Sequence, residues 1–173
     1  MSEFGDTPVG ADLLSPVDEL RTTLEGVLPA LNQGFRNAGI IAEGDAIKLK
    51  GRGAELTATS SRYDTGFAFW GFLRPDFGDF REPTGIIADI EAPDPGNGVG
   101  TGVVQAWEKA LSEAGVKNFA ATSIKALNKD GTLNRKPLQF WEKQGYSPWG
   151  NVSRDGIPYA MVKTLPQVDD ASE

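Results

Sequence analysis

The sequence predicts a single domain of the α/β class, of the α+β type, with a central mixed and mostly antiparallel sheet flanked by helices. Three β-rich segments separated by glycine-containing turns, at 46–50, 55–60 and 66–74, indicate an antiparallel meander. An apolar segment at 86–91, a glycine-rich stretch, a segment of helical period and a second apolar segment at 117–124 then indicate a β-loop-α-β unit. A chain of 173 residues that is 39% hydrophobic is long enough to form one core.

The first element after the polar, acidic N-terminal segment is helical. Residues 1–14 and 166–173 are expected to be flexible, which leaves 15–165 as the folded domain. The segment SPVD at 15–18 carries the signature of a helix start, with Ser as the cap and Pro in the first helical position. Apolar residues then recur at helical spacing as far as Gly39, but Gly26 and Pro29 interrupt them. We therefore expect two short consecutive helices.

The remaining elements follow from their patterns in order. The segment GFAFWGFL at 66–73 is apolar on both faces, which predicts an interior strand of the sheet. The helix after the glycine-rich stretch should end at Gly115 in a left-handed cap, and a closing strand is expected at 159–164. The apolar face of that helix comprises Val103, Val104, Trp107, Ala110, Leu111 and Ala114.

Composition excludes several kinds of chemistry. A net charge of −7 disfavours nucleic acid and anionic membrane surfaces as partners, although it also fits any ordinary acidic protein. The chain contains no Cys and no His, so we expect no metal site, and acid–base chemistry must use carboxylates, Tyr, Lys, termini or water. No apolar run approaches the ~20 residues of a membrane span, and no basic region precedes an apolar one at the N-terminus. We therefore expect a cytoplasmic protein.

The stretch PGNGVGTGVV at 95–104 places four glycines between a strand and a helix. Unpaired backbone N–H groups and the helix dipole at such a position favour an anion, most often a phosphate. Gly100 is followed by Thr101 and Gly102 instead of the Lys and Ser/Thr of a nucleoside-triphosphate loop. The dinucleotide pattern G-x-G-x-x-G also fails, because Thr101 and Val103 stand where its third glycine would be.

What remains, Gly96-x-Gly98-x-Gly100-Thr101, resembles the pyrophosphate loop of the GNAT superfamily of CoA-dependent N-acyltransferases. A second stretch resembles the same superfamily, because Asn134 precedes the segment PLQFWEKQGY with an aromatic residue, Trp141, seven positions later. The resemblance implies acetyl-CoA as co-substrate and an amine as its partner. It also implies that a backbone N–H of the strand before the glycines stabilises the oxyanion. The residues that it assigns to CoA binding are Ile90, Gly96, Asn97, Gly98, Val99, Gly100, Thr101, Asn134 and Phe140.

Two departures from the family pattern bear on mechanism. Pro95 stands where the family has Arg or Gln, so backbone N–H groups must carry more of the pyrophosphate binding. Trp141 stands where many members have the Tyr that protonates the leaving thiolate, and an indole cannot act as that acid. Tyr146 is expected in the core. Tyr159 is therefore the candidate acid, with a packing role as the alternative.

The resemblance implies a base that deprotonates the amine, and without His that base would be a carboxylate. Glu91 is the candidate, because simple alternation places it with Asp89 and Ile87 on one face of a central strand. The alternative is that Glu91 is solvated or capping at the strand end, and Glu55 and Asp64 are weaker candidates.

The function predicted is an N-acyltransferase, with acetyl as the acyl group, acting on a primary amine of a small molecule or protein. Two alternatives stay open. One is a non-catalytic module of the same fold. The other is a transferase that modifies nucleic acid, which the excess of acidic over basic residues disfavours. A homodimer is left open, and the acceptor is not identified by any motif.

Overall fold

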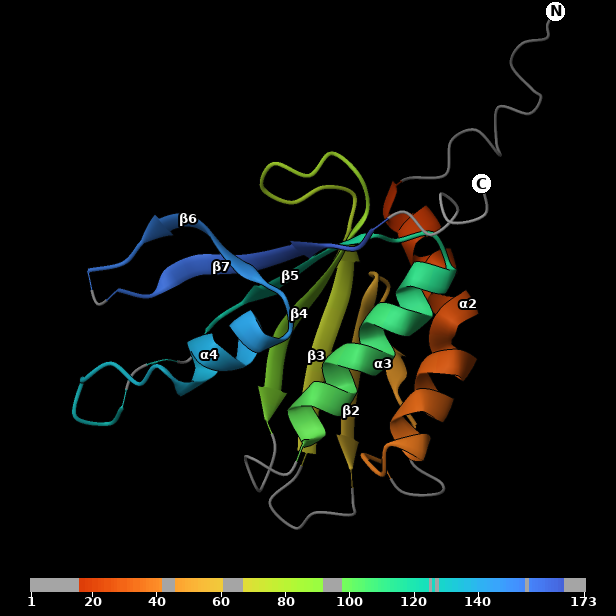
Figure 1. Ribbon diagram of the computed structural model, residues 1–173. Coiled ribbons are helices and arrows are strands. Elements are labelled where there is room, and N and C mark those ends of the chain that lie inside the picture. The colour runs from red at the N-terminus through yellow and green to blue at the C-terminus, as the bar shows by residue number, and fades with distance from the viewer. Residues whose placement is uncertain are drawn as a thin grey trace, which may run out of the picture.

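The computed structural model describes residues 16–41, 46–60, 67–91, 98–124, 126, 128–154 and 156–166. A seven-stranded sheet in the order β1-β2-β3-β4-β5-β7-β6 forms its centre (Figure 1). The strands are β1 (Lys48–Lys50), β2 (Glu55–Ser60), β3 (Phe67–Arg74), β4 (Thr84–Glu91), β5 (Asn118–Thr122), β6 (Ser147–Val152) and β7 (Pro158–Thr164). The helices are α2 (Pro16–Asn37), α3 (Val99–Glu113) and α4 (Lys136–Lys143).

The pairing of the strands confirms the predicted fold class. Strands β1 to β4 form an antiparallel meander, β4 and β5 are parallel, and β7 pairs antiparallel with both β5 and β6. The sheet is thus mixed and mostly antiparallel, and β3 is an interior strand as its apolar sequence predicted. The parallel β4–α3–β5 unit is the predicted β-loop-α-β unit.

The prediction of two short helices at the N-terminal end was wrong, because α2 is one helix of 22 residues with Pro29 inside it. Its buried residues, Leu20, Leu24, Val27, Leu31 and Phe35, form one stripe that continues past the proline. Burying this stripe against the sheet stabilises the helix by more than the one hydrogen bond that Pro29 removes.

The three helices lie on the same face of the sheet (Figure 1). Between them and the sheet, Phe69 packs edge-on against both Phe35 and Trp107, with ring centroids 5.5 and 5.3 Å apart. At the end of α3, Gly115 has a φ of +95° and the Val116 N–H donates to the Leu111 carbonyl, which confirms the left-handed cap. Ala114, predicted on the buried face, is the exposed C-cap residue instead, because the helix ends one residue before it.

Strand β4 contains a bulge that changes which side chains share a face. Trp70 pairs with Asp89 and Gly71 pairs with Ile87, so Ala88 is an extra residue in β4. Ile87 belongs to the core beneath the helices, whereas Asp89 shares the opposite face with Trp70. The predicted single face for Ile87, Asp89 and Glu91 was therefore wrong, because a bulge breaks simple alternation.

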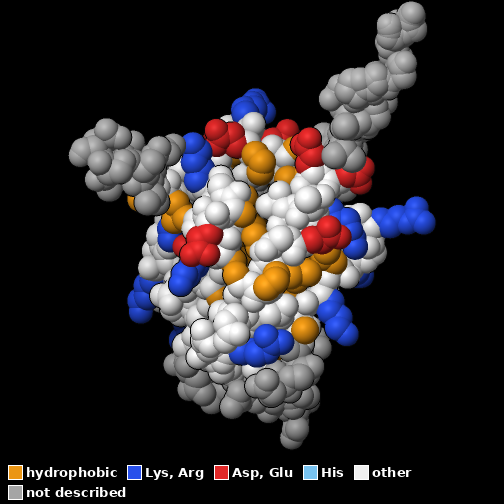
Figure 2. All heavy atoms as spheres, turned by 90° about the vertical axis from the view of Figure 1, so that its right-hand side faces the viewer, with side chains coloured by type: hydrophobic (Ala, Val, Ile, Leu, Met, Phe, Trp, Pro, Cys, Tyr) orange, Lys and Arg blue, Asp and Glu red, His pale blue; other side chains and the backbone are white. Residues whose placement is uncertain are grey.

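On the side of the molecule that carries α2, basic and acidic side chains are interspersed over the part that the structure describes (Figure 2). Such a surface has no field of one sign that would attract a nucleic-acid backbone to this face. Among the described residues, no helix combines the length and hydropathy needed to cross a membrane.

Candidate functional site

The N-terminus of α3 is the first part of the candidate site. Gly98 is the N-cap with a φ of +82°, a conformation that only glycine adopts without strain, and no side chain within the described part of the chain caps the helix. The first turn carries no acidic residue. The Gly102 N–H donates to the Gly98 carbonyl at 2.9 Å, so the amides of Val99, Gly100 and Thr101 precede the hydrogen-bond ladder of the helix.

These amides and the positive end of the helix dipole are therefore suited to binding an anion. Gly96 and Asn97, which the sequence assigned to the same loop, lie outside the described residues, as does Pro95.

Helix α4 lies over this N-terminus. A Cβ on Gly100 would be 3.1 Å from the Phe140 ring, so Gly100 and Phe140 are in close contact although they are far apart in sequence. Gln144, just after α4, donates its side-chain amide to the Thr101 hydroxyl at 3.1 Å. Gly100, Thr101 and Phe140, three residues predicted to bind CoA, are thus brought together.

Asn134 lies just before α4 and does not cap it, because Arg135 is the N-cap and the helix begins at Lys136. The Asn134 side-chain oxygen accepts a hydrogen bond from the Lys136 N–H at 3.1 Å, and its backbone N–H donates to the Ala126 carbonyl. The residue therefore makes a local turn before the helix, and it is half-buried. Its contact with a cofactor stays a prediction.

Strands β4 and β5 separate beside the α3 N-terminus. They pair only from Thr84 with Asn118 to Ile87 with Ala121, and the pairing stops where the bulge begins. From Asp89 to Glu91, the strand pairs that the structure describes for β4 are with β3, so β4 has left β5 over these residues. Ile90, predicted to bind CoA, lies in this part and packs its side chain against the core.

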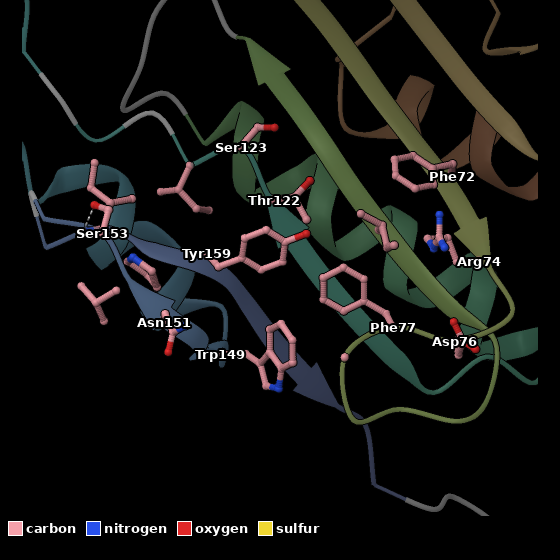
Figure 3. A pocket seen from close by; sticks show the side chains of 16 residues that line it. Phe72, Arg74, Asp76, Phe77, Thr122, Ser123, Trp149, Asn151, Ser153 and Tyr159 are labelled. Atoms are coloured by element: carbon pink, nitrogen blue, oxygen red, sulfur yellow. Dashed lines mark hydrogen bonds between the residues drawn. The ribbon is translucent and has the colours of Figure 1, made fainter.

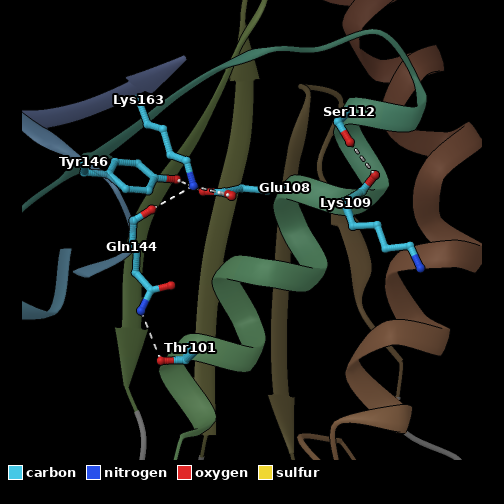
Figure 4. Close-up of polar contacts among 7 residues, drawn as sticks. All are labelled: Thr101, Glu108, Lys109, Ser112, Gln144, Tyr146 and Lys163. Atoms are coloured by element: carbon cyan, nitrogen blue, oxygen red, sulfur yellow. Dashed lines mark hydrogen bonds and ion pairs between the residues drawn. The ribbon is translucent and has the colours of Figure 1, made fainter. Parts of the chain in front are cut away.

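A buried polar network connects the α3 N-terminus with β7 (Figure 4). Glu108 accepts hydrogen bonds from Lys163 at 2.9 Å and from the Tyr146 hydroxyl at 2.7 Å. Lys163 also donates to the carbonyl of Gln144, whose side chain reaches Thr101. The network holds the turn after α4 against α3, and so it fixes the position of Thr101.

Burial raises the pKa of the Tyr146 hydroxyl well above its usual range, and the charge of Glu108 and the hydrogen bond to it raise that pKa further. Tyr146 is 3% exposed, which confirms its predicted place in the core. Sequence reasoning missed Glu108, although it follows Val104 by four residues and therefore lies on the apolar face of α3.

The opposite face of the sheet, which the helices leave uncovered, contains a cleft of about 960 Å³ (Figure 3). Its wall includes Phe72 and Ile86 from β3 and β4, and Ser123 just after β5. Trp149 from β6 and Tyr159 from β7 form the other side. Most of the lining residues are apolar or aromatic.

Ser123 is the residue of this cleft with an unusual backbone. Its φ of +57° is the only positive value outside glycine among the described residues. Such values are uncommon in residues other than glycine and occur often at functional sites. Nothing in the sequence singled out Ser123, because its conformation follows from how the chain leaves β5.

Tyr159, the candidate acid, projects into this cleft and is 63% exposed. Its neighbour Ala160 pairs with Thr122, so Tyr159 lies level with Ser123 on the adjacent strand. The position is open to a ligand at the point where β4 and β5 have separated. Proton donation by Tyr159 at this position stays a prediction.

The candidate bases lie on this same face of the sheet. Glu91 pairs with Ala68 and is exposed, and Asp89 pairs with Trp70 and is half-buried. Directly opposite residues of an antiparallel pair share a face, so both carboxylates lie on the cleft side. Glu55, opposite Phe72, is on this face two strands from β4, and Asp64 lies outside the described residues.

No protein-family model matches the sequence, and no curated protein matches it significantly. Among solved structures, a CoA complex of aminoglycoside 6'-N-acetyltransferase aligns with 67% of this chain and 76% of its own (19% identity, TM-score 0.44). Aminoglycoside 6'-acetyltransferase type Ii aligns with 96% of this chain and 97% of its own (19% identity, TM-score 0.43). A putative phosphinothricin N-acetyltransferase aligns with 77% of this chain and 75% of its own (18% identity, TM-score 0.38). TM-scores and identities this low do not bear on what the present chain binds.

Proposed function

We propose that this protein is an acyl-CoA-dependent N-acyltransferase that transfers an acetyl group to a primary amine. The observation that carries the proposal is the juxtaposition of the uncapped α3 N-terminus with the separation of β4 from β5. The first feature suits a pyrophosphate, and the second suits the extended, amide-containing arm that joins a pyrophosphate to a thioester in CoA. A single ligand with both parts accounts for both features.

Two parts of this chain would each bind a different part of CoA. The amides of Gly98, Val99, Gly100 and Thr101 would hold the pyrophosphate, and the backbone of β4 near Ile90 would bond to the arm. Bound acetyl-CoA would supply an acyl group already activated as a thioester.

The cleft on the uncovered face would bring the amine to the point where β4 and β5 separate. There Glu91, or Asp89 beside it, would accept the proton that the ammonium must lose before attack, directly or through water. Tyr159 would return a proton to the leaving thiolate. Two carboxylates on one face thus give the chain a base without histidine.

Titration calorimetry with CoA and acetyl-CoA, followed by a screen of primary amines, tests the proposal. The variant Gly100→Val should lose CoA binding, but it also strikes the Phe140 ring. The matched control is Gly102→Ala, whose added Cβ meets Ile40 and Ala38 at 3.3 and 3.4 Å on the other side of α3. Native affinity in a folded Gly100→Val variant would refute the pyrophosphate site.

The same measurements distinguish the non-catalytic alternative. Trp141 is 8% exposed and packs edge-on between Phe140 and Tyr146, so it is a core residue and cannot supply the acid. CoA binding without turnover of any amine would therefore favour a binding module over an enzyme.

A further inference from the structure

The far end of the cleft is formed by aromatic rings from three separate segments. Phe77, in the loop after β3, and Tyr159 each lie 5.8 Å from the ring of Trp149, measured between centroids. Figure 3 shows the three side chains directed toward one another, with Tyr159 between Trp149 and Ser123. A ligand that extends from Ser123 along the cleft therefore meets Tyr159 first and then the other two rings.

Close backbone contacts hold these rings in place. Gly78 has a φ of +58°, and a Cβ there would be 2.8 Å from the indole of Trp149. Phe77 and Phe80 exchange backbone hydrogen bonds of 3.1 and 2.8 Å, which tighten the loop beneath the indole. The Trp149 N–H donates to the Asp79 carboxylate at 3.1 Å. The aromatic surface is therefore formed before a ligand arrives.

The charges of the cleft argue against a polycationic ligand. Among the residues that the structure describes, its lining contains one acidic residue, Asp76, and one basic residue, Arg74, so their charges offset each other. The carboxylate of Asp79 accepts the indole hydrogen bond. A polyamine has several ammonium groups, each of which is best bound by a carboxylate, whereas a flat apolar group gains from offset or edge-on contact with three rings.

We propose that the acceptor is an arylalkylamine, a primary amine joined by a short aliphatic chain to an aromatic ring. The inference rests on the proposed function and adds the substrate class. The aromatic ring of the acceptor lies against Trp149, Phe77 and Tyr159. The amine then points toward Ser123, where β4 and β5 separate and the thioester would be presented.

Binding without catalysis tests the substrate class most directly. Phenethylamine and its uncharged product, N-acetylphenethylamine, are titrated into the full chain by calorimetry, with putrescine and glucosamine as the polycationic and sugar probes. Phenethylamine and its product should bind, and the other two should bind at least about tenfold more weakly. Equal or tighter binding of putrescine or glucosamine would overturn the proposal.

Variants locate the bound ring. Trp149→Ala should weaken phenethylamine binding about tenfold or more, and Phe77→Leu by a smaller factor. Trp70→Ala is the matched control, because Trp70 is 42% exposed on the same face of the sheet and does not line the cleft. Circular dichroism checks folding, and Phe77→Leu keeps the test decisive if Trp149→Ala unfolds. Unchanged affinity in both cleft variants, or an equal loss in Trp70→Ala, would refute the inference.

Affinity for CoA separates this inference from the function on which it rests. Selective binding of phenethylamine with no CoA binding would refute the transferase and leave the ligand class of the cleft standing. Conversely, CoA binding with no preference for aryl amines would refute the substrate class alone.

Discussion

A single negative charge introduced in the first turn of α3 should lower the affinity for an anion without lowering the stability of the fold. The variants Thr101→Glu and Thr101→Gln have nearly the same shape, and both lose the hydrogen bond from Gln144, which contributes about 0.5–1.5 kcal/mol. Only the Glu variant adds a negative charge at the helix N-terminus. There the dipole should stabilise it by about 0.3–1 kcal/mol, because this turn has no acidic residue in the native chain.

The same charge should oppose a bound pyrophosphate. A carboxylate about 6 Å from one phosphate charge, at an effective dielectric constant of about 40–80, is repelled by about 0.7–1.4 kcal/mol. Two phosphate charges double this value, which corresponds to a loss of about 10- to 100-fold in affinity relative to Thr101→Gln. The Glu variant should thus be at least as stable as the Gln variant but bind CoA more weakly.

The assay is calorimetric titration of both variants with CoA at low and high salt, together with thermal unfolding. The difference in affinity should shrink at high salt because the repulsion is screened. Equal CoA affinities in two folded variants would show that the α3 N-terminus does not hold the pyrophosphate.

Three further predictions concern stability and turnover. The pKa of Tyr146 is raised in the folded state, so its neutral hydroxyl stabilises the fold at pH values below the unfolded-state pKa of about 10. The free energy of unfolding should therefore decrease as the pH rises above about 10. In denaturant unfolding measured over a series of pH values, Tyr146→Phe should show a smaller decrease. Glu91→Gln should lower kcat about 100-fold or more near pH 7, and kcat should recover as the pH approaches the amine pKa of about 10. If the pH–rate profiles of the variant and the wild type are parallel, Glu91 is excluded as the base and Asp89 is favoured. Asn134→Asp should keep the turn and the stability of the fold, whereas Asn134→Ala should lower the free energy of unfolding by about 1 kcal/mol. If Asn134 contacts the cofactor, both variants should bind CoA more weakly than the wild type.

Most of the order of elements could be read from local patterns, although no pattern predicted β6. Alternation and turn residues located β2 and β3, and the glycine-rich stretch located the start of α3, because these signals act over a few neighbouring residues. The left-handed cap at Gly115 was predicted for the same reason.

The continuity of α2 and the arrangement of the site depended on tertiary structure. Pro29 is a local signal for a break, and only burial of the whole stripe from Leu20 to Phe35 against the sheet overrides it. The bulge at Ala88 likewise depends on the register between β3 and β4, which no pattern within β4 records.

The sequence by itself determined the fold class, the glycine-rich helix start and the exclusion of histidine and cysteine from acid–base chemistry. Tertiary structure decided that Phe140 lies over Gly100, and that Trp149 and Phe77 face Tyr159. The physical reason is that an anion site at a helix N-terminus is made by consecutive backbone amides and is therefore visible in sequence. A cleft is made by side chains from distant strands, whose proximity arises only when the sheet forms.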